Sequence, residues 1–158
     1  MRADKLLKPQ AIGERNFSGA NLSETNLNDV DLSEADLTKA NLSGTQLRGA
    51  KLSGSKLKDA NLVNADLSYA NLSDSNLSGV NLNGATLRGA DLSGANLQGA
   101  NLNNADLRQA NLTDSNLSAA ELKGSKIKGA IGLDAKSSPL TRRQGPLSSL
   151  SFAQVIAT

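Results

Sequence analysis

Residues 90–109 consist of four versions of one five-residue unit, Ala-Asp-Leu-Ser-Gly, Ala-Asn-Leu-Gln-Gly, Ala-Asn-Leu-Asn-Asn and Ala-Asp-Leu-Arg-Gln. The unit continues in both directions, and its central residue recurs every five positions from Phe17 to Ile127, which makes 23 repeats, 21 of them centred on Leu. The residue two before the centre is always small: 22 such positions hold 14 Ala, four Ser, two Thr and two Val. Each unit therefore places one large and one small side chain in a predicted interior.

A period of five fits neither a helix, whose apolar residues recur every 3.6 positions, nor a strand, where they recur every 2. A turn must therefore intervene in every unit. Eleven of the 14 glycines occupy the second position after the centre, where a turn that needs unusual backbone angles tolerates them best. We predict that each unit is one short extended side followed by one corner. The residue before the centre, Asn twelve times and Asp five times, is expected to face water with the two residues that follow the centre.

Units such as Ala20-Asn21-Leu22-Ser23-Glu24 resemble the A(D/N)LXX motif of the pentapeptide-repeat family, as does the unit at residues 90–94. The resemblance implies an all-β fold, a right-handed quadrilateral β-helix in which four units form one coil of 20 residues. At four units a coil, the 23 repeats make about 5.75 coils. With an inter-strand spacing of about 4.8 Å, the stack is expected to be roughly 25–30 Å tall.

The chain divides into three predicted segments. Residues 1–15 are predicted to cap the first coil, with a short helix that ends at Pro9; residues 16–131 form the solenoid. The five-residue phase breaks at Gly132, so residues 132–158 are a C-terminal tail, compatible with either a disordered segment or a short capping or dimerising helix near its end. Both ends matter, because an open coil edge invites uncontrolled pairing unless it is covered.

Composition excludes several kinds of chemistry. The chain has no Cys and no His, which removes disulfides, thiol nucleophiles, imidazole bases and the common zinc ligand sets, and we expect no cofactor and no metal. Its start lacks the apolar stretch of a secretory signal, and no segment approaches the ~20 apolar residues of a membrane span, so a cytoplasmic location without membrane contact is expected. The net charge of the chain is +2, but residues 16–130 carry ten basic and twelve acidic groups. The repeats themselves are therefore slightly negative, which argues against a nucleic-acid partner.

Because a coil contains 20 residues, residues 20 apart are predicted to form columns. We define the basic face by the centres Leu27, Leu47, Leu67, Leu87, Leu107 and Ile127; it carries five bases against three acids. This face is either an ordinary solvated surface or a partner-binding site, because a row of guanidinium groups binds acidic or phosphorylated groups. The candidate partner-binding stripe is Arg48, Tyr69, Arg88, Arg108 and Lys128.

The next side, the acidic face, has the centres Leu32, Leu52, Leu72, Leu92 and Leu112 and a net charge of −4, from five acids against Lys51. Its row of Ser and Thr hydroxyls suggests ice binding as a function. We disfavour that function because the row is mostly Ser and charges flank it. The asparagine face, which precedes the basic face, stacks Asn21, Asn41, Asn61, Asn81 and Asn101, as expected for a structural hydrogen-bonded ladder.

These features favour a non-catalytic interaction scaffold that presents polar faces to an unidentified protein partner. The family resemblance supplies an alternative, because some members mimic duplex DNA and bind DNA gyrase or other type II topoisomerases; that role requires a strongly negative rod. Carboxylate pairs such as Asp31 and Asp36 lie on a convex surface without the desolvating cleft that acid–base catalysis requires, so an enzyme is not expected. A homodimer formed through an end of the solenoid or through the C-terminal tail is a further candidate partnership.

Overall fold

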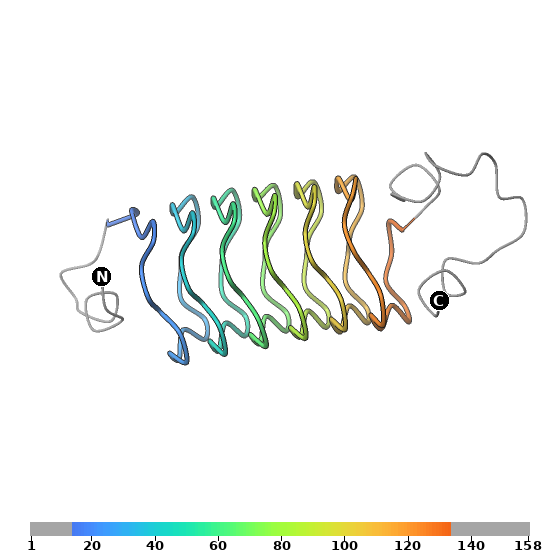
Figure 1. The fold of residues 1–158 in the computed structure, drawn as a ribbon, viewed down its shortest axis with the longest axis horizontal. Helices are drawn as coiled ribbons and strands as arrows, with labels where there is room; N and C mark the ends of the chain where they lie inside the picture. The colour runs from blue at the N-terminus through green and yellow to red at the C-terminus, as the bar shows by residue number, and fades with distance from the viewer. Residues whose placement is uncertain (1–13, 134–158) are drawn as a thin grey trace, which may run out of the picture.

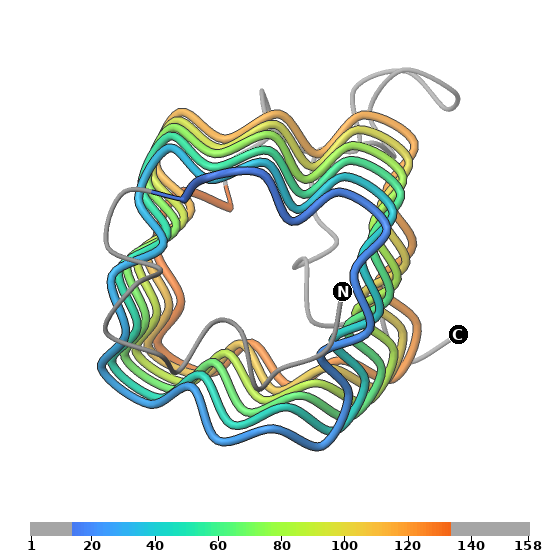
Figure 2. The same cartoon turned by 90° about the vertical axis from the view of Figure 1, so that its left-hand side faces the viewer.

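The computed structural model describes residues 14–133, which wind into a stack of square coils (Figure 1). Seen along the stack, the chain runs clockwise as it moves away from the viewer, so the solenoid is right-handed and four-sided (Figure 2). Residues 14–133 contain no helix and no strand longer than a single bridge. Instead, 20 one-residue parallel bridges, from Asn16↔Asp36 to Asn111↔Ile131, each join residues 20 positions apart. The predicted 20-residue coil is therefore confirmed.

Neighbouring coils satisfy each other's backbone groups. The Leu22 N–H donates to the Asn41 carbonyl at 2.8 Å, and the Asn41 N–H donates back to the Ala20 carbonyl at 2.8 Å. Within a coil, the Ala20 N–H donates to the Phe17 carbonyl at 3.0 Å and closes a four-residue turn. The third residue of each such turn has a positive φ, as a type II turn requires. Gly adopts such a φ without strain, which explains why it is common at that position. The pattern repeats along the solenoid, so each interior coil depends on the coils on both sides.

The interior is filled by the two inward positions of each unit. Centres from Leu22 to Leu112 are at most 1% exposed, and the small residues two before them are buried beside them, except Thr25 and Val30, which are partly buried. Burying one such Leu contributes about 1.5–3 kcal/mol. On the last described coil the burial weakens: Ile127 is only partly buried and Ile131 is 57% exposed.

The two predicted end segments lie largely outside the described residues. Only Glu14 and Arg15 of the predicted N-terminal cap are described, and they are not helical, so the short helical cap has no support from residues 14–133. At the other end, the Ile131 N–H donates to the Ala110 carbonyl at 3.0 Å, so the coil continues as far as this residue. The predicted C-terminal tail lies beyond the described residues, apart from Gly132 and Leu133.

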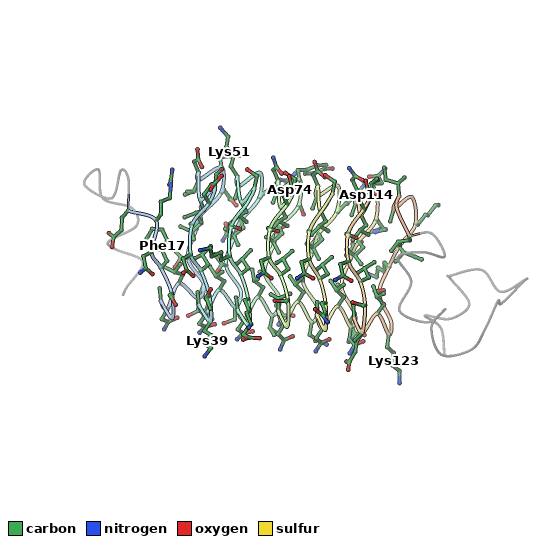
Figure 3. The ribbon with its side chains drawn as sticks, turned by 90° about the horizontal axis from the view of Figure 1, so that it is seen from above. Phe17, Lys39, Lys51, Asp74, Asp114 and Lys123 are labelled. Carbon is green, nitrogen blue, oxygen red and sulfur yellow. The ribbon has the colours of Figure 1, made fainter. Side chains whose placement is uncertain are left out.

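Because the cross-section is square, outward side chains of different columns lie along separate edges of the rod. Lys51, Asp74 and Asp114 project along one edge of the rod, and Lys39 and Lys123 project along the opposite edge (Figure 3). Side chains fill the interior between these edges, so within residues 14–133 a partner can be contacted only on the outer surface.

Candidate functional site

Where the residue before a centre is Asn or Asp, it caps the backbone of its own repeat. Within the described coils, the N–H of the first residue after the centre has no backbone partner in the neighbouring coil, and the side-chain oxygen of the Asn or Asp accepts from it. Asn21 Oδ1 accepts from Ser23 N at 3.2 Å, and Asp66 Oδ1 accepts from Ser68 N at 2.9 Å. All 17 Asn and Asp residues at this position make the same contact. A short amide or carboxylate suits this two-residue reach.

The predicted asparagine ladder exists, but it is secondary to capping. Asn41 Nδ2 donates to Asn21 Oδ1 at 3.3 Å, and Asn61 Nδ2 donates to Asn41 Oδ1 at 3.3 Å. These contacts confirm the predicted ladder for the first three Asn of the asparagine face, whereas Asn81 and Asn101 only cap their own repeats. The same oxygens also hold the corner backbone, which the sequence analysis did not anticipate.

The corners follow a second period of 40 residues. On three of the four corner columns a side chain alternates strictly with Gly from coil to coil, and the side chain lies over the Gly of the next coil. A Cβ added at Gly84 would stand 2.5 Å from Asn64 Oδ1, whereas at Gly99, which follows another Gly, it would meet nothing within 4 Å. The alternating columns are Glu24-Gly44-Asn64-Gly84-Asn104-Gly124, Asp29-Gly49-Tyr69-Gly89-Gln109-Gly129 and Glu34-Gly54-Asp74-Gly94-Asp114.

On the basic face, the predicted stripe does not behave as one row. Arg108 is held by Asp106 of its own repeat: Nε donates to Oδ1 at 2.8 Å and Nη2 donates to Oδ2 at 2.5 Å. The Arg108 guanidinium keeps the pKa of Asp106 below its usual value, because the hydrogen bonds favour the carboxylate. This is the one salt bridge within residues 14–133. Arg108 is therefore largely neutralised by its neighbour, unlike Arg48 and Arg88, whose repeats carry Gln46 and Thr86 at the same position.

Tyr69 and Arg48 are brought together by the coil stacking. The Arg48 guanidinium carbon lies 5.7 Å from the centroid of the Tyr69 ring, within the range of a cation–π contact. The ring lies over Gly89 of the next coil, where an added Cβ would stand 2.6 Å from Tyr69 Cε1. Tyr69 nevertheless remains 54% exposed. Of the stripe's other members, Arg88 and Lys128 are exposed in the column of Arg48, with Lys128 on the last described coils.

Two capping carboxylates on neighbouring sides of the rod have lowered pKa values. Hydrogen bonds from the Ser33 backbone and hydroxyl lower the pKa of Asp31 on the acidic face, and those from the Thr38 hydroxyl and backbone lower the pKa of Asp36 on the next side. A general acid needs the opposite shift. Within the part of the chain that is described, no group of His, Cys, Asp and Glu is arranged to hold a metal ion, and no helix is long and apolar enough to cross a membrane.

A family model described as pentapeptide repeats, in eight copies, matches residues 16–54, 55–94 and 90–129. The chain belongs to the pentapeptide-repeat family. Each matched segment of this pentapeptide-repeat protein spans about two coils, the same length as the alternation along its corners.

Solved structures of other pentapeptide-repeat proteins share the fold. Rfr23 from the cyanobacterium Cyanothece 51142 is 35% identical, with a TM-score of 0.55; the match covers 77% of this chain and 93% of Rfr23. QnrB1, a plasmid-mediated fluoroquinolone resistance protein, is 27% identical, with a TM-score of 0.50; that match covers 74% of this chain and 68% of QnrB1. No curated protein sequence matches the chain significantly. The right-handed quadrilateral β-helix is therefore shown, and the relatives leave the specific function open.

The sequence placed Arg48, Arg88, Arg108 and Lys128 of this pentapeptide-repeat protein in one column, with Tyr69 in the neighbouring column, but did not show how these residues differ. The signal for the Arg108 pairing was present, since its repeat has an acid two residues earlier, whereas the repeats of Arg48 and Arg88 do not. The alternation of Gly89 with Tyr69 was also visible in the sequence. Its meaning required knowing that a corner side chain lies over the next coil.

Proposed function

We propose that this pentapeptide-repeat protein is a non-catalytic scaffold that presents its basic face to a protein partner. The observation that supports the proposal best is the exposed Tyr69, placed beside Arg48 on a frame whose backbone groups are already paired. Aromatic and Arg side chains are the residues most often responsible for binding energy in protein interfaces. Neighbouring coils hold the frame in place, so a partner would meet an ordered surface and lose little entropy in ordering it.

A matched pair of charge variants tests the proposal. The full chain is immobilised beside a variant with Arg48, Arg88 and Arg108 changed to Glu, and bound proteins are identified by mass spectrometry. The control variant changes the exposed Lys51, Lys56 and Lys58 to Glu, which alters the net charge equally but elsewhere on the rod. We expect one or more partners to bind the wild-type and control chains and to be lost from the stripe variant.

The partner identified in this way is then purified and titrated against all three chains by calorimetry. A partner that binds the stripe variant as well as the wild type would show that the basic face is not the interface. Turnover of a substrate by the purified chain would overturn the non-catalytic assignment.

A second candidate function is that of a DNA-mimic modulator of DNA gyrase or another type II topoisomerase. It is favoured by the likeness to QnrB1, a fluoroquinolone resistance protein. The charge pattern weighs against it, because residues 16–130 have ten basic and twelve acidic groups and mimicry of duplex DNA needs a strongly negative rod. A supercoiling assay with DNA gyrase, with and without a fluoroquinolone, tests this candidate: absence of both inhibition and drug protection would exclude it.

A further inference from the structure

On the coils before Arg108, the positive charge of the basic face comes from two residues, Arg48 and Arg88. Arg108 is bound to Asp106 through two hydrogen bonds, so it has less charge to offer a partner. No carboxylate of residues 14–133 forms an ion pair with Arg48 or Arg88. The nearest acid in the intervening repeat, Asp66, accepts hydrogen bonds from Ser68 N at 2.9 Å and Ser68 Oγ at 2.5 Å, which occupy one of its oxygens.

Tyr69 stands in the coil between these two arginines. Its ring contacts Arg48 on one side and lies over Gly89, the neighbour of Arg88, on the other. A side chain at position 89 would displace the ring, so the Gly is what allows the aromatic surface to lie along the rod. The result is a compact site with a positive charge at each end and an exposed aromatic surface in the middle.

The spacing of the charges selects a conformation of the partner. Arg48 and Arg88 lie in one column two coils apart, which is about 9.6 Å at a spacing of about 4.8 Å per coil. A polyproline II segment has three residues per turn and advances about 9.3 Å in that turn, so its residues i and i+3 lie on one side at this separation. In a β-strand, residues on one side recur at about 6.6 or 13 Å, which fits poorly. Aromatic side chains are also the usual platform for polyproline II ligands.

We propose that Arg48, Tyr69 and Arg88 bind an acidic polyproline II segment of a partner protein, with carboxylates three residues apart on the two guanidinium groups and an intervening proline on the Tyr69 ring. This inference rests on the proposed scaffold function and specifies the chemistry of the partner. Arginine suits the role because its guanidinium binds a carboxylate through two parallel hydrogen bonds.

Synthetic peptides test the spacing directly. The full chain is titrated by fluorescence anisotropy with a labelled peptide that repeats Glu-Pro-Pro, and with a peptide of equal length, Glu content and Pro content in which the Glu residues are two and four apart. A third, helical peptide carries Glu residues seven apart. We expect the first peptide to bind at least about tenfold more tightly than the other two, with an affinity that falls as salt is raised. Equal binding of all three peptides would mean unselective attraction and would overturn the proposal, as would tighter binding of the helical peptide.

Four substitutions locate the binding. Arg48→Gln, Arg88→Gln and Tyr69→Ala are each expected to weaken the Glu-Pro-Pro peptide by about tenfold, and Gly89→Ala by severalfold because it displaces the ring without removing any of the three side chains. The matched controls are Lys56→Gln, Lys123→Gln and Gly99→Ala, which lie outside the stripe and are expected to change the affinity by less than about twofold. Circular dichroism of each variant verifies that the solenoid is folded.

The outcomes separate this inference from the scaffold function. If no peptide binds but the stripe variant still loses a protein partner, the scaffold remains and the polyproline II assignment is wrong. If the Glu-Pro-Pro peptide binds and the controls weaken it as much as the site variants, the site has been placed on the wrong residues.

Discussion

Changing Gly84 to Ala tests whether a corner side chain packs on the coil that follows it. Gly84 has a φ of +69°, and a Cβ there would stand 2.5 Å from Asn64 Oδ1; ordinary contact begins near 3.4 Å. Gly99 has almost the same backbone, with a φ of +66°, but an added Cβ would meet nothing within 4 Å. Gly99→Ala therefore measures the cost of an Ala in the left-handed region alone, about 1–2 kcal/mol.

In Gly84→Ala the Asn64 side chain must also move by about 1 Å, which forces it out of its rotamer at a further cost of about 0.5–1.5 kcal/mol. For the 120 residues from Glu14 to Leu133, an unfolding entropy of about 2.1 cal/mol/K per residue makes 1 kcal/mol equivalent to about 4 °C. We expect Tm to fall by about 4–8 °C in Gly99→Ala and by about 2–6 °C more in Gly84→Ala.

The assay is thermal unfolding followed by circular dichroism, completed as a double-mutant cycle. Asn64→Gly removes the overlapping side chain, so it is expected to remove the extra cost of Gly84→Ala but to leave Gly99→Ala unchanged. Equal Tm shifts in the two Ala variants, with no coupling between positions 64 and 84, would refute the steric origin of the 40-residue alternation.

Three further predictions concern the core, the capping carboxylates and the end of the described coils. Leu72→Asp buries an unpaired carboxylate and is expected to lower the free energy of unfolding in urea by about 3–5 kcal/mol. Asn71→Ser keeps a capping oxygen and is expected to lower it by less than about 1 kcal/mol. Equal losses would contradict the assignment of inner and outer positions. The lowered pKa values of Asp31 and Asp36 mean that the unfolded chain takes up protons at higher pH than the folded chain, so stability is lost as pH falls from about 4 through the lowered values. The double variant Asp31→Asn, Asp36→Asn is expected to match the wild type at pH 7 and to lose less stability in acid, and an unchanged acid dependence would count against capping by these carboxylates. In Gly132→Ala, at the position where the next centre would stand, the new Cβ would overlap the backbone of residues 112 and 113. Hydrogen exchange is expected to speed up in peptides covering residues 110–133 and not in the central coils, and uniform protection would show that this position tolerates a side chain.

Much of the fold was predictable because one short unit carries it. Leu or an equivalent side chain at every fifth position, with Ala two before it, can be buried only if the chain turns once per unit, and Gly at the corners indicates where it turns. The coil of 20 residues came with the family resemblance, and the parallel bridges from Asn16↔Asp36 onward confirm it. The placement of Arg48 and Arg88 in one column, with Tyr69 beside it on the same face, followed from that number alone.

The tertiary structure decided what the outer residues do within those columns. Column arithmetic places residues above one another but does not give the direction of a side chain. It therefore treated Arg108 as equal to Arg48, whereas one is bound to Asp106 and the other lies against Tyr69. It also predicted a ladder along the asparagine face but not that these Asn side chains cap the backbone two residues ahead. The sequence by itself determined the inside of this protein, because burial depends on the period; the directions of side chains over the next coil, which depend on contacts 20 residues away, required the structure.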